Sequence, residues 1–102
     1  MSEQPGTASF EVLEGGRARA LGSLVFTTVA GLLPPGAAAI EAGQAGIIDL
    51  TGVKLSDSSG LALLIEWLSV ATAAGRTLRY ENMPTQLLQL ARLSDVEELI
   101  SP

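Results

Sequence analysis

Histidine and cysteine are both absent from this sequence of 102 residues. Without histidine there is no imidazole to serve as a general base, and without cysteine there is no thiol nucleophile. These absences exclude Ser-His-Asp hydrolases, thiol enzymes and zinc sites built on His or Cys. They also exclude disulfides, which is compatible with a reducing compartment.

Basic residues are few: the sequence contains six Lys and Arg and eleven Asp and Glu, so its net charge is −5. The basic residues do not cluster, so neither a nucleic-acid-binding patch nor a basic membrane-surface helix is predicted. Residues 20–40 carry no charge, but Pro34-Pro35-Gly36 interrupts them, and we predict a strand and a helix instead of a membrane span. The opening residues MSEQPGTAS do not resemble a signal peptide, so a cytoplasmic location is expected.

Apolar residues make up 47 % of the chain, which is sufficient for one modest core. We expect a flexible N-terminus at residues 1–7 and a single domain over residues 8–102. The pattern predicts four strands, of which the first two form a hairpin across Gly15-Gly16: residues 9–13, 17–24, 46–50 and 77–80. The predicted fold class is α/β, a mixed four-stranded sheet with helices in the order β-β-α-β-α-β-α-α.

Residues that are typical of helix N-termini and C-termini predict where the helices begin and end. Thr27 or Thr28 is expected to cap the first helix, which Pro34-Pro35 then stops or kinks before it resumes over residues 37–41. The strongest helix covers residues 60–74 and ends at Gly75. Two further helices are predicted near the C-terminus: one from Met83-Pro84 to residue 93, and a short one after the capping-box pattern Ser94-Asp95-Val96-Glu97.

The segment Asp57-Ser58-Ser59-Gly60 is the most site-like stretch of the chain. In the simplest interpretation Asp57 caps the following helix, because its carboxylate can accept from amides two or three residues on. The same helix N-terminus would accommodate a phosphate on Ser58, which makes a phosphorylation switch the alternative. A catalytic serine is disfavoured, since no histidine can take its proton and Lys54 is the only lysine.

The helix predicted over residues 60–74 has more apolar surface than one contact needs. One face consists of Leu61, Leu64, Ile65 and Leu68, and a second face consists of Leu63, Trp67 and Val70. One apolar face is enough to cover a sheet. The second face therefore meets either a neighbouring helix or a partner protein, and in the latter case Trp67 would be the natural anchor.

Two long segments carry a family resemblance: IIDLTGVKLSDSSGLALLIEWL and AAGRTLRYENMPTQLLQLARLSDVEELI. Both resemble STAS domains, the family of anti-sigma-factor antagonists, in the apolar strand ending in Asp-Leu, the D-S-S-G-L motif, and the helix, glycine and strand that follow. The resemblance covers nearly the whole chain and is strongest from Gly46 to Ile100. It implies a STAS-like fold and a non-enzymatic domain without cofactor or metal.

The resemblance leads to two functions. In the branch that it favours, the STAS subunits of the Mla phospholipid-transport ABC system, the domain binds the cytoplasmic ATPase and only indirectly the inner-membrane permease. This system maintains outer-membrane lipid asymmetry, and the subunit would be peripheral to the inner membrane. The partner-binding residues would be Asp57, Ser58, Ser59, Gly60, Leu63 and Trp67. In the other branch a partner kinase phosphorylates the serine at the Ser58 position, and the domain is an anti-sigma-factor antagonist.

Overall fold

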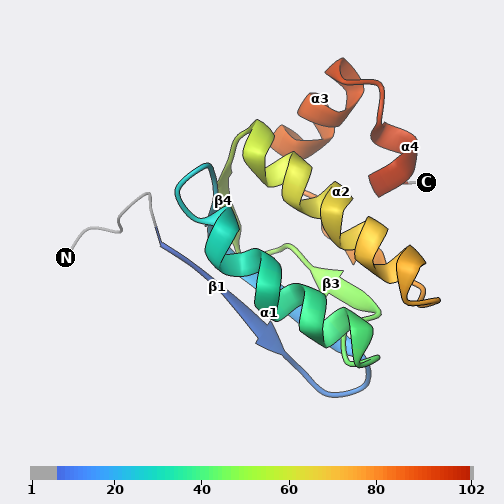
Figure 1. Cartoon of the computed structure of the whole chain (residues 1–102). Coiled ribbons are helices and arrows are strands. Elements are labelled where there is room, and N and C mark those ends of the chain that lie inside the picture. The colour runs from blue at the N-terminus through green and yellow to red at the C-terminus, as the bar shows by residue number, and fades with distance from the viewer. Residues whose placement is uncertain (1–6, 102) are drawn as a thin grey trace.

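The computed structural model describes residues 7–101, so the predicted flexible N-terminus lies outside the described residues except for Thr7. Five strands and four helices follow in the order β-β-α-β-β-α-β-α-α (Figure 1). Their bounds are β1 Ala8–Val12, β2 Arg17–Leu24, α1 Val29–Glu41, β3 Ile47–Asp49, β4 Val53–Ser56, α2 Ser58–Ala73, β5 Arg79–Glu81, α3 Thr85–Leu93 and α4 Glu97–Ile100.

The strands form one mixed sheet in which β1, β2, β3 and β5 are consecutive neighbours. Strands β1 and β2 are antiparallel and form the predicted hairpin, whereas β3 pairs in parallel with β2 and with β5. The predicted count of four strands was wrong, because β4 pairs in parallel with the last residues of β2 after an irregularity at Gly22/Ser23. Strand β4 has only four residues, which is too short for an alternating apolar pattern to be recognised in the sequence.

Helices α1 and α2 lie over one face of the sheet, and α3 and α4 lie beside α2 (Figure 1). The alternation along β2 and β3 directs the fully buried Ala18, Ala20 and Ile48 toward these helices. Intervening residues such as Arg17 and Arg19 point to the opposite, solvent-exposed face. The core therefore lies between the sheet and the helices, and among residues 7–101 no helix is long and apolar enough to cross a membrane.

Helix α1 includes Pro34 and Pro35, so it does not stop there, and residues 37–41 are helical as predicted. Next to the prolines, Gly36 packs so closely on Trp67 that a Cβ atom would lie 2.3 Å from the indole ring. The indole Nε1 donates a hydrogen bond to the Leu33 carbonyl at 3.2 Å. Tertiary packing on Trp67 thus stabilises a helix that its two prolines disfavour.

Two of the predicted helix caps were also wrong. Thr28 precedes α1 but makes no capping bond: its hydroxyl oxygen accepts from the Val25 amide at 3.0 Å and the hydroxyl donates to the Ser23 carbonyl at 2.6 Å. The short helix α4 exists, yet it starts at Glu97, and the carboxylate of that residue accepts from Arg92 Nε at 2.9 Å. Ser94 instead ends α3, so the capping-box pattern is not used.

Candidate docking surface

Asp57 connects two segments at the start of α2. Its Oδ1 atom accepts hydrogen bonds from the amides of Ser59 at 2.8 Å and Gly60 at 3.3 Å, which confirms the predicted N-cap. Its Oδ2 atom accepts a further hydrogen bond, at 3.2 Å, from the amide of Phe26 in the loop between β2 and α1. One carboxylate therefore caps α2 and fixes the loop that precedes α1.

Gly60 allows α2 to begin directly against the end of β2. A Cβ atom at this position would lie 2.5 Å from the Leu24 carbonyl oxygen, far closer than normal contact. The requirement for glycine at the end of the DSSG segment is thus a packing requirement. It sets the height at which the first turn of α2 lies over the sheet.

The two serines of the segment have different surroundings. Ser58 is exposed on the first turn of α2, and within residues 7–101 its hydroxyl forms no hydrogen bond. Ser59 is partly buried and lines a groove between the two helices. A partner could therefore reach Ser58 directly, while Ser59 forms part of the wall beside it.

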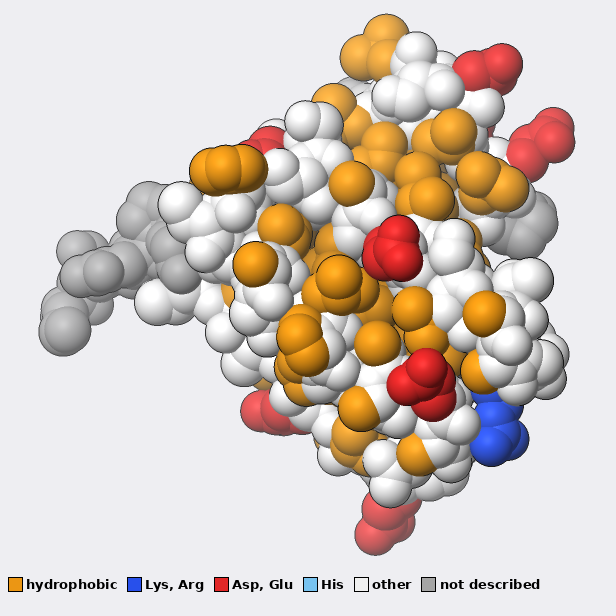
Figure 2. Space-filling view, viewed as in Figure 1, with side chains coloured by type: hydrophobic (Ala, Val, Ile, Leu, Met, Phe, Trp, Pro, Cys, Tyr) orange, Lys and Arg blue, Asp and Glu red, His pale blue; other side chains and the backbone are white. Residues whose placement is uncertain are grey.

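The groove lies between α1 and α2 and has a volume of about 490 Å³. Its lining is almost entirely apolar or small: Phe26, Val29, Ala30, Leu33, Ser59, Ala62, Leu63 and Glu66. Phe26 is 79 % exposed, and Glu66 provides the charged side chain of the lining. Figure 2 shows that apolar side chains extend across this helical face and that acidic side chains on it outnumber basic ones.

Trp67 does not contribute to this surface, so its predicted role as a direct anchor is contradicted. Its side chain is fully buried under α1, and its ring centroid lies 5.5 Å from that of Phe10. Leu63 is 4 % exposed and only borders the groove. The second apolar face of α2 thus packs mainly on a neighbouring helix, the alternative that the sequence left open.

The exposed aromatic residue is Phe26, which the sequence analysis missed. The sequence did contain a sign of this exposure, since Phe26 is an isolated aromatic residue that is followed by two threonines just before a helix. Its exposure depends on the loop conformation held by Asp57, 31 positions later.

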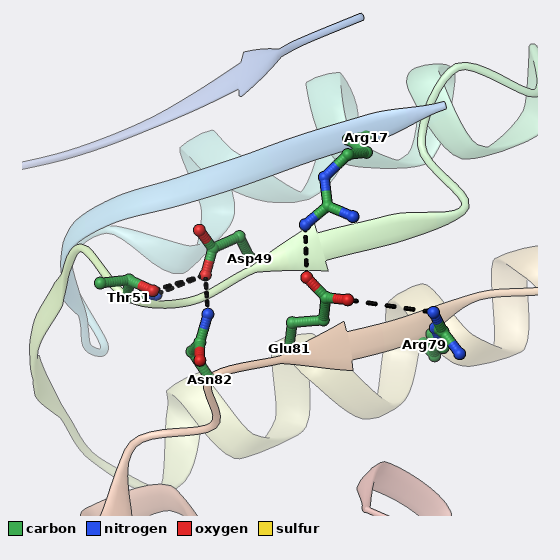
Figure 3. A network of polar contacts seen from close by, with 6 residues as sticks. All are labelled: Arg17, Asp49, Thr51, Arg79, Glu81 and Asn82. Carbon is green, nitrogen blue, oxygen red and sulfur yellow. Dashed lines mark hydrogen bonds and ion pairs between the residues drawn. The ribbon is translucent and has the colours of Figure 1, made fainter. Parts of the chain in front are cut away.

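The opposite face of the sheet carries a polar network (Figure 3). Arg17 on β2 pairs with Glu81 on β5, and Arg79 approaches the same carboxylate at 3.9 Å. Asp49 accepts from the Thr51 amide at 3.0 Å and from Asn82 Nδ2 at 2.9 Å. These hydrogen bonds, from Asn82 above all, lower the pKa of Asp49.

This network lies on the solvated side of the sheet, whose other face is the one that the helices of residues 7–101 cover. Asp49 and Asp57 take part in different hydrogen-bond networks, and among residues 7–101 no group of three candidate metal-ligating side chains occurs.

Comparison with known proteins identifies the family. A family model described as "Mlab, STAS domain" matches residues 14–101. The chain belongs to the STAS domain family. No curated protein matches its sequence significantly.

Two solved structures have the same fold as this STAS domain. The phosphorylated form of SpoIIAA, a cell fate determinant of Bacillus, superimposes with a TM-score of 0.67 at 16 % identity, covering 92 % of this chain and 88 % of that one. The unphosphorylated form of the anti-sigma factor antagonist SpoIIAA gives a TM-score of 0.64 at 16 % identity, covering 85 % and 83 %. At this identity the likeness establishes the fold, and the predicted STAS-like fold is confirmed.

Proposed function

We propose that this STAS domain is a non-enzymatic subunit that binds the ATPase of a phospholipid-transporting ABC complex, which maintains outer-membrane lipid asymmetry. It would lie on the cytoplasmic side of the inner membrane and reach the permease only through the ATPase. The observation that carries the proposal is the match of residues 14–101 to the Mlab STAS model. STAS domains act through protein–protein contacts, and the groove beside the DSSG segment is a surface suited to such a contact.

The groove has the composition of a protein-binding site. Interfaces gain most of their affinity from a few aromatic or apolar anchors that are surrounded by polar groups. Phe26 is such an anchor, and Ser58, Ser59 and Glu66 are the polar groups next to it. The hydrogen bond from the Phe26 amide to Asp57 holds the loop in place before binding, which reduces the entropy lost on association.

The surroundings of Ser58 support a binding role over catalysis. The neighbouring carboxylate, Asp57, already accepts hydrogen bonds from three backbone amides, so it is engaged in structure and not placed as a general base. Binding can change the activity of an ATPase only if the domain has different affinities for its conformational states. We therefore assign the domain to stabilising the ATPase or favouring its assembled state.

The accessibility of Ser58 favours one alternative, an anti-sigma-factor antagonist switched by phosphorylation. The hydroxyl lies exposed on the first turn of a 16-residue helix, where partial positive charge accommodates a phosphate. The fold match to SpoIIAA in its phosphorylated form agrees with this possibility. A phosphate here would place negative charge beside an apolar groove and oppose docking.

Copurification of the tagged protein from its native host tests both functions. We expect an ABC ATPase and its permease in the eluate, with unmodified Ser58 by mass spectrometry. A small serine kinase of the anti-sigma type, or a phosphate on Ser58, would instead support the switch. Phe26→Ala should lower the yield of ATPase in the eluate, whereas Leu93→Ala, an equally exposed change on α3 outside the groove, should not.

A further inference from the structure

Strand β1 forms one edge of the sheet, and no strand among residues 7–101 pairs with its outer side. The Leu13 amide donates to the Arg17 carbonyl at 2.7 Å, and the Ser23 amide donates to the Thr7 carbonyl at 2.9 Å. In an antiparallel pair the bonded residues alternate, so the odd-numbered residues of β1 bond to β2. The backbone groups of Ala8, Phe10 and Val12 therefore point away from the sheet, and within residues 7–101 no strand pairs with them.

This edge lacks most of the features that usually prevent strand pairing. Charged side chains also discourage pairing, and the one in β1, Glu11, is held by Arg19 of the same chain at 2.6 Å. The other such features are prolines, lysines, bulges in the edge strand, or a covering element. The five residues ASFEV contain none of these, and no helix or strand lies beyond β1 in the described part of the chain (Figure 1). Val12, near the end of this edge, is 48 % exposed although it is on the helix-facing side of the strand.

A hollow of about 310 Å³ borders the same edge, between β1 and α1. Ala8, Ser9 and Phe10 line it from the strand, and Thr27, Thr28, Gly31, Leu32 and Pro35 line it from α1 and the two residues before it. An added strand would have its helix-facing side chains beside this hollow. The edge thus offers backbone groups for pairing and space for the side chains that come with them.

We propose that β1 pairs antiparallel with β1 of a second copy of this chain, about a two-fold axis at Phe10. In this register Ala8 lies opposite Val12 of the second copy, so the apolar side chains of both strands meet on the helix-facing side. On the other side Ser9 lies opposite Glu11 of the second copy, and like charges do not directly face each other. Each Glu11 is already paired with Arg19 of its own chain at 2.6 Å.

We assign the strand that pairs with the β1 edge to a second copy of this chain, because β1 is complementary to itself in this register. Small Ala8 is matched with larger Val12, which suits the hollow that Ala8 lines. Isologous two-fold contacts of this kind are the commonest form of protein self-association. The dimer would have one continuous sheet across both copies.

This contact is independent of the proposed ATPase-binding groove. The hollow uses the side of α1 that carries Gly31, Leu32 and Pro35, whereas the groove uses the side with Val29, Ala30 and Leu33. Both grooves of the dimer would therefore stay open. Failure of either proposal leaves the other one standing.

Cysteine cross-linking tests the register directly, because the native chain contains no cysteine. In the variant carrying Ala8→Cys and Val12→Cys, each new thiol lies opposite its counterpart in the second copy. Paired Cα atoms across a ladder lie about 5.5 Å apart, within disulfide range, whereas residues 8 and 12 of one strand are about 13 Å apart. Mild oxidation should yield a covalent dimer, and Ser9→Cys with Val12→Cys, which places the thiols on opposite sides, should not.

Sedimentation equilibrium of the cysteine-free chain gives the second readout. We expect a monomer–dimer equilibrium, and Val12→Lys should raise the dimer Kd at least about tenfold by placing a charge among apolar side chains. Leu55→Lys, an equally exposed change on β4, should leave the Kd unchanged. The proposal is overturned if the chain sediments as a monomer throughout, if Val12→Lys leaves its dimer intact, or if both cysteine pairs cross-link equally.

Discussion

The Asp57 carboxylate accepts a hydrogen bond from the Phe26 amide at 3.2 Å, although the two residues are 31 positions apart. Its other oxygen caps α2. The aspartate of the DSSG segment therefore positions both sides of the groove, since Phe26 belongs to the α1 side and Ser59 to the α2 side. This relationship explains how a helix cap contributes to a binding surface.

Asp57→Ala removes both the cap of α2 and the hydrogen bond from the Phe26 amide. We expect a loss of about 1–2 kcal/mol in the free energy of unfolding, measured by urea denaturation. Asp57→Asn keeps an acceptor oxygen and should lose less. Glu14→Ala, in the exposed β1–β2 turn, is the control and should leave the midpoint unchanged. A fully stable Asp57→Ala protein would contradict the structural role of this carboxylate.

Phe26→Ala and Trp67→Ala should separate binding from folding. The exposed Phe26 ring packs little in the free protein, so its removal should weaken ATPase binding more than about fivefold, above 1 kcal/mol, without lowering stability. Removal of the buried Trp67 should instead cost about 3–5 kcal/mol of stability. Titration calorimetry with the ATPase and thermal unfolding measure the two effects. Normal binding by Phe26→Ala would exclude the groove as the contact.

An acidic residue at position 58 should affect stability and partner binding in opposite directions. Ser58→Asp adds an acidic group in the first turn of α2, where the helix dipole favours negative charge, so stability should be unchanged or slightly higher. Docking should nevertheless weaken, because the charge would be buried without a partner. Ser58→Ala should leave the fold intact. Full copurification of the ATPase with Ser58→Asp would refute a docking role for this position.

Gly36→Ala and Gly31→Ala form a matched pair within α1. At Gly36 the new methyl group would lie 2.3 Å from the Trp67 ring, so we expect a marked loss of stability. At Gly31 nothing lies within 4 Å, and alanine should stabilise the helix by about 0.5–1 kcal/mol. Thermal unfolding compares the two proteins at one low concentration. Equal effects would contradict the close packing of α1 on Trp67.

The hydrogen bonds to Asp49 predict a pH dependence. Because they lower its pKa in the folded state below the ordinary value of 3.8, ionised Asp49 stabilises the fold above that value. This stabilisation is lost as the pH falls through the folded-state pKa. Asp49→Asn should therefore lower stability at neutral pH, and the difference from the native protein should shrink in strongly acidic solution. A difference that stays constant across this range would contradict the assignment.

The cap at Asp57 was predictable because it depends on amides only two and three residues away. The β1–β2 hairpin was predictable for a similar reason, since Gly15 and Gly16 adopt the positive φ angles that its turn requires. The Gly75 end of α2 likewise has a φ of 68°. In each case the determining interaction is local, so the sequence pattern contains it.

The features that the sequence did not predict depend on distant contacts. Strand β4 forms only because the end of β2 is available for pairing, and α1 continues through its prolines because Trp67 packs on it. The same packing buries Trp67 and leaves Phe26 as the exposed aromatic residue. A helical pattern shows how many apolar faces exist, but not which neighbour covers each one.

The sequence by itself determined the STAS family, the hairpin, the start of α2 and the absence of histidine and thiol chemistry. These follow from residue identity and from interactions within a few positions of the chain. Only the tertiary structure decided which aromatic residue faces solvent, where the groove lies and which strand edge stays open. Those properties arise from the packing of segments that are far apart in the chain, and packing is settled only when the whole core forms.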